Sequence, residues 1–316
     1  MRYEPLQLVT ETGGSEILGY NLQMDDGLGG AFVSLYGSNS DDINVNTMVL
    51  YHTVDKGLIR GRRYGFRYRA RNHYGWSDQY SPVTYILAIE RPQVAPKEPQ
   101  LSSASDNQIT LILSLCPDDG STPILKYELW MSDGLETSTY TQVSSYLVNS
   151  FEMTHTLQTG VDPIVSGNIY GFKWRCYNLM GYSDWSETFY AAAAEKPAKP
   201  TTPIIDYQWS DNSTIFVQWS KVSDGLGEEG NLIRGYKLYM DDGLGGPFKV
   251  IYDTVVLSPE IRHYLVPNLT HSLNYRFYVE AYNFNGGGPA SDIAFLKPCS
   301  LPSLWQKPHW ISNTKT

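Results

Sequence analysis

The sequence lacks the patterns that mark most enzymes and metalloproteins. Its 316 residues include only three cysteines and six histidines, and no two histidines have the H-x-x-H or H-E-x-x-H spacing of a zinc site. It has no G-x-S-x-G elbow, P-loop or dinucleotide fingerprint either. We therefore expect no catalytic residue, no bound metal and no cofactor, and we predict that the chain is not an enzyme.

The sequence also lacks a membrane span and a basic surface. No apolar run approaches the roughly eighteen residues that a transmembrane helix requires, and residues 1–10 are too polar and short for a secretory signal. The formal net charge of −9 argues against a nucleic-acid partner, because a phosphate backbone calls for a basic surface. We expect neither a membrane span nor nucleic-acid binding.

A strand pattern of alternating apolar and polar residues occurs three times, at 64–72, 170–178 and 275–283, about 105 residues apart. In the third copy Tyr275, Phe277, Val279 and Ala281 fall on one face of a strand. The alternation at 109–115 and 215–219 predicts further strands. Repeats of this length, broken by Gly, Pro, Asn and Asp, indicate tandem all-β sandwiches with no helix longer than a turn.

The repeated pattern Y-x-F-x-V-x-A-x-N-x-x-G-x-S, preceded by strands at 17–20, 124–127 and 233–236, resembles the fibronectin type III family. The resemblance covers nearly the whole chain. It implies three immunoglobulin-like sandwiches, as in tandem fibronectin type III proteins, and it is nearly silent on function.

The repeats divide the chain into three expected domains, and the first is incomplete. We predict domains at 1–91, 92–196 and 197–297, the first without its opening A strand. Residues 298–316 then form a linker plus an orphan A strand. Proline-rich, charged linkers precede the second and third domains and favour an extended rod.

The two ends of the chain complement each other. Residues 310–316 followed by 1–9 match the third repeat from Trp209 onward. We therefore expect the tail of one copy to complete the first sandwich of the next by donor-strand complementation, so that copies form a head-to-tail homopolymer. The expected interface residues are Leu301, Leu304, Trp305, Trp310, Tyr3, Leu6 and Leu8.

The match between the two chain ends has two further interpretations, which are open. The chain could be one period of a longer tandem array, or it could be cut between strands without functional meaning. The leading hypothesis is a structural subunit of an extracellular filament or surface coat. The alternatives are a monomeric adhesion or receptor fragment that binds a protein or glycan through its loops, and an accessory region of a carbohydrate-active enzyme.

A second resemblance concerns the last strands of the first two repeats. The segment 182–186, Tyr-Ser-Asp-Trp-Ser, is similar to the WSxWS box of cytokine-receptor type III domains. It implies a ladder in which aromatic rings and cations alternate, each step contributing about 0.5 to 1 kcal/mol. The expected members are Lys173, Arg175, Trp185, Arg67, Arg69, Arg71 and Trp76. Surface stiffening and a receptor for a folded ligand are both open interpretations.

Two near-identical acidic segments, 24–30 and 240–246, contain Asp-Asp-Gly. Asp-Gly between strands predicts a tight hairpin with positive φ. Clustered Asp could instead hold calcium, but no ligand spacing for that ion accompanies it.

The cysteines and sequons suggest where the chain functions. We expect Cys176 to be a buried thiol that does not bond to Cys116, and Cys299 could pair with Cys116 or across a polymer joint. Asn212 and Asn268 lie in glycosylation sequons on expected surface loops. For a secreted or cell-surface protein, both should carry glycan.

Overall fold

The computed structural model describes residues 12–37, 57–134, 139–149, 151–222, 233–255 and 260–300. Its residues form two compact units, one from 1–97, 115–128 and 174–186, the other from 98–114, 129–173 and 187–316. The division passes through the second repeat, which contributes strands to both units. It does not test the predicted domain boundaries, which stay predictions.

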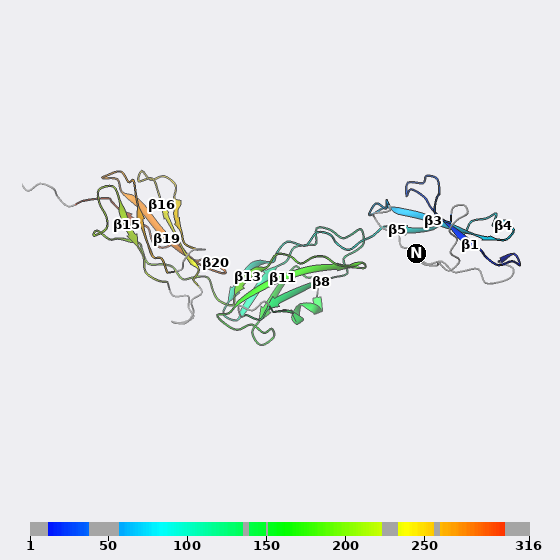
Figure 1. The fold of residues 1–316 in the computed structure, drawn as a ribbon. Helices are drawn as coiled ribbons and strands as arrows, with labels where there is room; N and C mark the ends of the chain where they lie inside the picture. Colours follow the sequence, from blue (N-terminus) through cyan, green and yellow to red (C-terminus); the bar gives the residue numbers. More distant parts are fainter. Residues whose placement is uncertain are drawn as a thin grey trace, which may run out of the picture. The chain divides into compact units, whose positions relative to one another are not determined.

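The first repeat forms one antiparallel sheet of five strands (Figure 1). These are β1 (Gly19–Met24), β2 (Val33–Tyr36), β3 (Arg63–Asn72), β4 (Gly75–Trp76) and β5 (Thr84–Leu87). The order is β2-β1-β3-β4, and β5 also pairs with β3. Met24, Tyr64 and Phe66 are buried together on one side. Residues 1–9, expected to supply a strand of the opposing sheet, lie outside the described residues, so the missing A strand stays a prediction.

The second repeat has two antiparallel sheets. The smaller sheet contains β6 (Gln100–Ser105), β7 (Gln108–Ile112) and β10 (Thr154–Gln158) in the order β10-β7-β6. The larger contains β8 (Lys126–Ser132), β9 (Tyr140–Gln142), β11 (Ile169–Asn178), β12 (Gly181–Tyr182) and β13 (Phe189–Ala192). Its order is β12-β11-β8-β9, with β13 also on β11. A six-residue 3₁₀ helix, η2 (Ser144–Asn149), makes about two turns, so our expectation of at most one turn was wrong.

The third repeat is a sandwich with one continuous core. Its smaller sheet contains β14 (Ile204–Ile205), β15 (Ile215–Gln218) and β18 (His263–Val266). Its larger sheet contains β16 (Gly235–Met240), β17 (Lys249–Asp253), β19 (Tyr275–Asn283), β20 (Gly286–Gly287) and β21 (Ala294–Leu296).

Alternation along the strands builds this core. Ile215 and Val217 from β15 and Phe277 and Val279 from β19 are all fully buried in one cluster. Each such side chain contributes about 1.5 to 3 kcal/mol when removed from water. The predicted inward faces of 215–219 and 275–281 are confirmed.

The predicted alternation of the second repeat fails at its end. Ile109, Leu111 and Leu113 are buried, but Leu115, which should face inward by the same parity, is 70% exposed. The physical reason is that β7 ends at Ile112, so the backbone beyond it no longer has the two-residue period of a strand.

Candidate functional site

A buried asparagine at the end of β11 holds the linker that enters the second repeat. Asn178 Nδ2 donates to the carbonyl of Glu90 over 2.7 Å and to that of Asp119 over 2.8 Å. The Glu90 N–H donates in turn to the Gly120 carbonyl over 3.1 Å. Both main-chain polar groups of Glu90 are thus bound, and all these residues lie in one compact unit.

Gly120 permits this close approach. Its φ is +68°, in the left-handed region that favours glycine. A Cβ at this position would lie 2.0 Å from the Glu90 carbonyl oxygen. Any side chain at residue 120 would therefore displace the linker.

A charged network surrounds the same junction. Arg60 pairs with Glu90 over 3.1 Å and with Asp118 over 2.8 Å. Asp118 also accepts the N–H groups of Gln93, over 2.6 Å, and Gly120, over 3.0 Å. Burial alone would raise the pKa of Asp118, but these donors and the Arg60 guanidinium outweigh it and lower the pKa below its ordinary value.

The linker that enters the third repeat is held in a related way. Asn283 Nδ2 donates to the Glu195 carbonyl over 2.7 Å. Asn285 donates to the carbonyls of Ala194, over 2.6 Å, and Ala192, over 2.9 Å, and accepts the Ala192 N–H over 2.8 Å. These contacts lie within the second compact unit.

An apolar contact supports this second junction. Phe284, between the two asparagines, packs with Ile169 against the buried Ala192 and Ala194. Sequence reasoning missed both junctions. It treated the asparagine that recurs at 72, 178 and 283 as part of a family pattern, although its regular position was the available signal.

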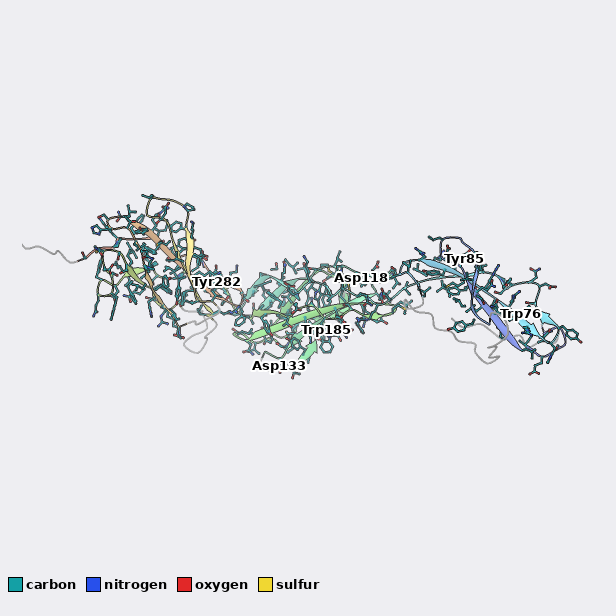
Figure 2. The ribbon with its side chains drawn as sticks, turned by 45° about the horizontal axis from the view of Figure 1, so that its top comes forward. Trp76, Tyr85, Asp118, Asp133, Trp185 and Tyr282 are labelled. Carbon is teal, nitrogen blue, oxygen red and sulfur yellow. A yellow bond between two sulfur atoms is a disulfide. The ribbon has the colours of Figure 1, made fainter. Side chains whose placement is uncertain are left out.

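A stack of cations and rings covers one face of the first repeat. The Arg67 guanidinium lies 4.0 Å from the centre of the Tyr80 ring, and Arg69 lies 5.0 Å from the same ring. Arg69 is also 4.9 Å from the Trp76 ring, and Arg71 is 5.9 Å from it. Trp76 and Trp185 are labelled in Figure 2. The structure thus brings together four of the expected residues and adds Tyr80, which sequence reasoning did not name.

The second repeat has a shorter stack around Arg175. Its guanidinium lies between the rings of Tyr182, at 3.8 Å, and Trp185, at 4.2 Å. It also pairs with the buried Glu128 over 2.9 Å. Lys173, another expected member, lies 4.1 Å from the Tyr140 ring.

Buried Glu128 helps to organise this stack. Tyr182 Oη donates to it over 2.6 Å and Lys126 Nζ over 2.9 Å. Burial alone would raise its pKa, but Tyr182, Lys126 and Arg175 together lower it.

Serines fix the backbone beneath the stack. Ser183 and Ser186 each make two hydrogen bonds with β11: their N–H groups donate to the Cys176 and Trp174 carbonyls over 2.9 Å. Their hydroxyls accept the N–H groups of the same residues over 3.2 and 3.1 Å. The segment 182–186 is therefore anchored to β11.

The third repeat replaces most of the cations with rings. Arg276 pairs with Asp241 over 2.7 Å and lies 4.8 Å from the Phe248 ring. The Tyr278 ring packs edge-on against Phe248 at 4.8 Å and stacks on Tyr239 at 4.4 Å.

The acidic segments are loops built by their own carboxylates. Asp26 Oδ1 accepts the N–H groups of Leu28 and Gly30 over 2.8 and 2.9 Å, and Asp242 does the same for Leu244 and Gly246 over 2.9 and 3.0 Å. Gly27 and Gly243 have positive φ, as expected. However, each loop runs from the end of one strand to the next over eight residues, 25–32 and 241–248, so the tight hairpin was wrong.

Metal clusters and membrane-spanning helices are both absent from the described ranges. Within them, no group of three or more His, Cys, Asp or Glu residues could hold a metal ion. Of the helical segments in the same ranges, none is long and apolar enough to cross a membrane.

The cysteine prediction was wrong. Cys116 and Cys176 form a disulfide, with their Cα atoms 6.2 Å apart. Because the strand ends before Leu115, parity does not carry through to Cys116, and its side chain reaches the core-facing Cys176. Cys299 is free and half-buried.

A Ser-His-Asp cluster in the second repeat resembles a catalytic triad in composition only. Ser145 Oγ donates to Asp162 and contacts His155 Nε2 over 2.9 Å. In a triad the carboxylate binds the histidine, and the histidine then activates the serine. Here the carboxylate takes the hydroxyl directly and also accepts the Gln158 N–H over 3.0 Å, so the cluster joins η2 to β10.

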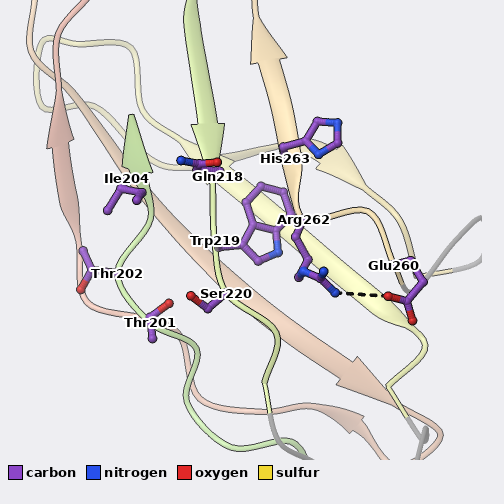
Figure 3. Close-up of a pocket in the computed structure, with 9 residues that line it drawn as sticks. All are labelled: Thr201, Thr202, Ile204, Gln218, Trp219, Ser220, Glu260, Arg262 and His263. Atoms are coloured by element: carbon purple, nitrogen blue, oxygen red, sulfur yellow. Dashed lines mark hydrogen bonds and ion pairs between the residues drawn. The ribbon is translucent and has the colours of Figure 1, made fainter. Parts of the chain in front are cut away.

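The third repeat has a hollow of about 550 Å³ at one end of its smaller sheet, where β15 ends and β14 and β18 begin (Figure 3). Arg262 and Glu260 pair with each other in it over 3.2 Å. Trp219 Nε1 has no hydrogen-bond partner among the described residues, and the neighbouring segments 223–232 and 256–259 lie outside them. These lining residues do not point to a particular ligand.

The remaining expected sites divide between described and undescribed residues. Asn212 and Asn268 are both exposed, as attachment of glycan requires. The seven expected polymer-interface residues, in 1–11 and 301–316, lie outside the described residues.

No family model matches the chain. Human Myomesin-2 is 27% identical over 263 residues, which cover 81% of this chain and 17% of that protein. Human Fibronectin type-III domain-containing protein 3A is 26% identical over 312 residues, covering 94% of this chain and 23% of that protein. The chain thus spans less than a quarter of either relative. A crystal structure of the chicken CNTN1 FN1–FN3 domains covers 92% of this chain and 91% of that one, at 20% identity and a TM-score of 0.40.

Proposed function

Because the chain is a tandem array of fibronectin type III domains, we propose that it is a structural subunit of an extracellular filament or surface coat. Copies assemble head to tail, and the C-terminal strand of one completes the N-terminal sandwich of the next. The observation that carries this proposal is the pair of clamped junctions, at Asn178 and Asn283.

The clamps favour a mechanical function. Flexible linkers between domains suit a protein that must adapt its reach, whereas a linker whose backbone is bound transmits force and orientation. A hydrogen bond contributes about 1 kcal/mol, and an orphaned buried partner costs more. At each junction several such bonds act on two or three linker residues, so bending there has an appreciable cost.

The stacks support the same function. Arg67, Arg69 and Arg175 each lie against two aromatic rings, so their cationic groups already have partners within the chain. A receptor surface would more usefully leave such groups for its ligand. Stiffening of the sandwich therefore accounts for them better than ligand binding does.

A disulfide and two exposed glycosylation sequons favour an extracellular location. Disulfides persist in oxidising compartments and are rare in the cytosol, which fits the bond between Cys116 and Cys176. Asn212 and Asn268 are exposed sequons that a secretory pathway could modify.

The sequence repeat supports this mode of assembly. Residues 301–316 repeat the opening of the third domain, and a strand of this kind can pair with an unpaired edge of a sandwich in another copy. A head-to-tail contact that does not close into a ring gives an open filament.

The test compares the mass of native material under denaturing, reducing conditions with its sedimentation in native buffer. A polypeptide near 36 kDa before glycan that sediments as a long polymer supports non-covalent assembly. A far heavier polypeptide would instead indicate a covalent array, and a small native particle would refute the filament.

A further inference from the structure

The first repeat has a hollow of about 290 Å³ where the other repeats receive their linkers. Gly13, Asn72, Trp76 and Asp78 are among the residues that line it. All of its lining residues are described and belong to one compact unit.

The lining residues have direct counterparts in the second repeat. Aligning the repeats pairs Thr12 with Asp119, Gly13 with Gly120, Ile17 with Ile124, Asn72 with Asn178, Trp76 with Tyr182 and Asp78 with Asp184. In the second repeat these positions bind the backbone of Glu90 and the guanidinium of Arg91. The hollow therefore occupies the positions that hold the linker in the second repeat.

The geometry of the two sites agrees. Asn72 Nδ2 donates to the Thr12 carbonyl over 3.0 Å, as Asn178 does to its counterpart Asp119. Gly13 has φ +66°, against +68° at Gly120. Asn178 donates two hydrogen bonds from its side-chain amide, one to Asp119 and one to the linker carbonyl of Glu90. Among the described residues, Asn72 makes only the first kind, and the hydrogen bond to a linker carbonyl has no counterpart there.

Strand register identifies the matching linker residue. Tyr64, Tyr170 and Tyr275 pair with Ile86, Ala191 and Leu296 respectively. Four residues beyond these partners stand Glu90, Glu195 and Ser300, and each is followed two residues later by proline, at 92, 197 and 302. Ser300 is thus the third member of the clamped series.

We propose that the hollow of the first repeat binds the backbone of Ser300 from a second copy of this chain. Asn72 Nδ2 donates to the Ser300 carbonyl, and the Ser300 N–H donates to the Gly13 carbonyl. Because Asn178 and Gly120 contact only main-chain groups of Glu90, serine can replace glutamate at the matching position. This inference rests on the proposed head-to-tail assembly and adds to it a second contact, separate from the donor strand.

The known junction and the proposed one differ in the residue that follows the clamped position. Arg91 donates to the Tyr182 carbonyl over 3.2 Å and pairs with Asp184 over 3.1 Å. The residue after Ser300 is Leu301, so the corresponding Asp78 lacks a cation from the incoming copy. A Leu301→Arg change should therefore strengthen docking two- to threefold through Asp78, as an exposed ion pair does.

The test uses two fluorescent peptides and the full chain at low nanomolar concentration. One peptide, 294–316, carries the linker and the strand, and the other, 303–316, carries the strand alone. Binding is measured by anisotropy to the wild type, Gly13→Ala and Gly14→Ala. Both glycines have positive φ, at +66° and +75°, so both changes strain the backbone alike. Only the first puts a methyl group where a seated linker would lie, since a Cβ at Gly14 meets nothing within 4 Å.

We expect 294–316 to bind wild type and Gly14→Ala at least tenfold more tightly than Gly13→Ala. Binding of 303–316 should be weaker and the same for all three proteins. Equal binding of 294–316 to both variants, or equal binding of the two peptides to wild type, would overturn the linker site and leave donor-strand assembly standing. Failure of both peptides to bind the wild type would overturn both.

An Asn72→Asp variant provides a second measurement if Gly13→Ala does not fold. Asp keeps the acceptor that the Tyr74 N–H uses, over 2.9 Å, but it replaces the amide donor with a negatively charged oxygen, which cannot donate to a linker carbonyl or to the Thr12 carbonyl. It should weaken binding of 294–316 about fivefold or more and leave 303–316 unchanged. Unchanged binding of the longer peptide would contradict the clamp.

Discussion

Asn178 donates its side-chain amide to the main-chain carbonyl of Glu90 over 2.7 Å, across 88 residues of sequence, and Asn283 and Glu195 repeat this bond at the same separation. A carbonyl needs no particular side chain, so the bond fixes where the linker passes and leaves its composition free. The repeated asparagine therefore acts as a clamp on the backbone of the preceding linker.

Changing Asn178 to Asp should loosen the first junction. The carboxylate keeps the acceptor for Met180 and Gly181 but cannot donate to Glu90 or Asp119. We expect a loss of about 2 kcal/mol in the free energy of unfolding, measured with denaturant. Hydrogen exchange at the Glu90 amide should also be faster.

The matched control for this change is Asn107→Asp. Asn107 is an exposed turn residue whose side chain accepts from Ser105, so Asp preserves the contact. It should change stability by less than about 0.5 kcal/mol. Equal losses in the two variants would contradict the clamp.

Two substitutions of Tyr80 should distinguish the contribution of its ring to stability from that of its hydroxyl. Tyr80→Leu removes the ring that faces both Arg67 and Arg69, and should cost about 1 to 2 kcal/mol. Tyr80→Phe loses only the hydrogen bond from Gln23, 2.9 Å long, and should cost about half as much. Thermal unfolding of both variants tests this, and equal losses would assign the effect to the hydroxyl.

Acid should weaken the third repeat through Asp241. Burial alone would raise the pKa of this carboxylate, but the N–H groups of Arg276 and Gly243 and the Arg276 guanidinium lower it below its ordinary value. A lowered folded pKa stabilises the protein above the unfolded pKa of about 3.9, and that stability is lost as the pH falls through the folded pKa.

Asp241→Asn should therefore cost about 2 to 3 kcal/mol at pH 7 and flatten the acid dependence of unfolding below pH 4. The control is Asp292→Asn, which removes an exposed pair with Lys199 and should cost about 0.5 kcal/mol. An unchanged acid slope in Asp241→Asn would show that other carboxylates control it.

The disulfide predicts a specific pattern of peptides. Non-reducing digestion should yield a peptide pair joined through Cys116 and Cys176, with Cys299 available to an alkylating reagent after unfolding. Replacing both bonded cysteines by serine opens a loop of about sixty residues and should cost about 2 to 5 kcal/mol. Recovery of a bond to Cys299 would contradict this arrangement.

Much of the fold could be predicted because burial follows a two-residue period within a strand. The faces of 215–219 and 275–281 are examples, since every second residue there is buried. The period fails where a strand ends, and that point is set by tertiary contacts. Leu115 is exposed and Cys116 is bonded for this reason.

The candidate site was harder to predict than the fold. Main-chain carbonyls such as those of Glu90 and Glu195 leave no mark in the sequence, so only one partner of each clamp could be seen. The acidic loops were misjudged for a related reason. Asp26 and Asp242 bind amides two and four residues ahead, which stabilises an eight-residue loop as well as a tight turn.

The central claim, that copies join head to tail, is tested most directly with a chain terminator. A variant without residues 301–316 can accept a strand but cannot donate one. Mixed with full-length chain in small amounts, it should shorten the polymers seen by sedimentation velocity in proportion to its share. Polymers whose length does not respond, or full-length chain that stays monomeric at every concentration, would contradict the account.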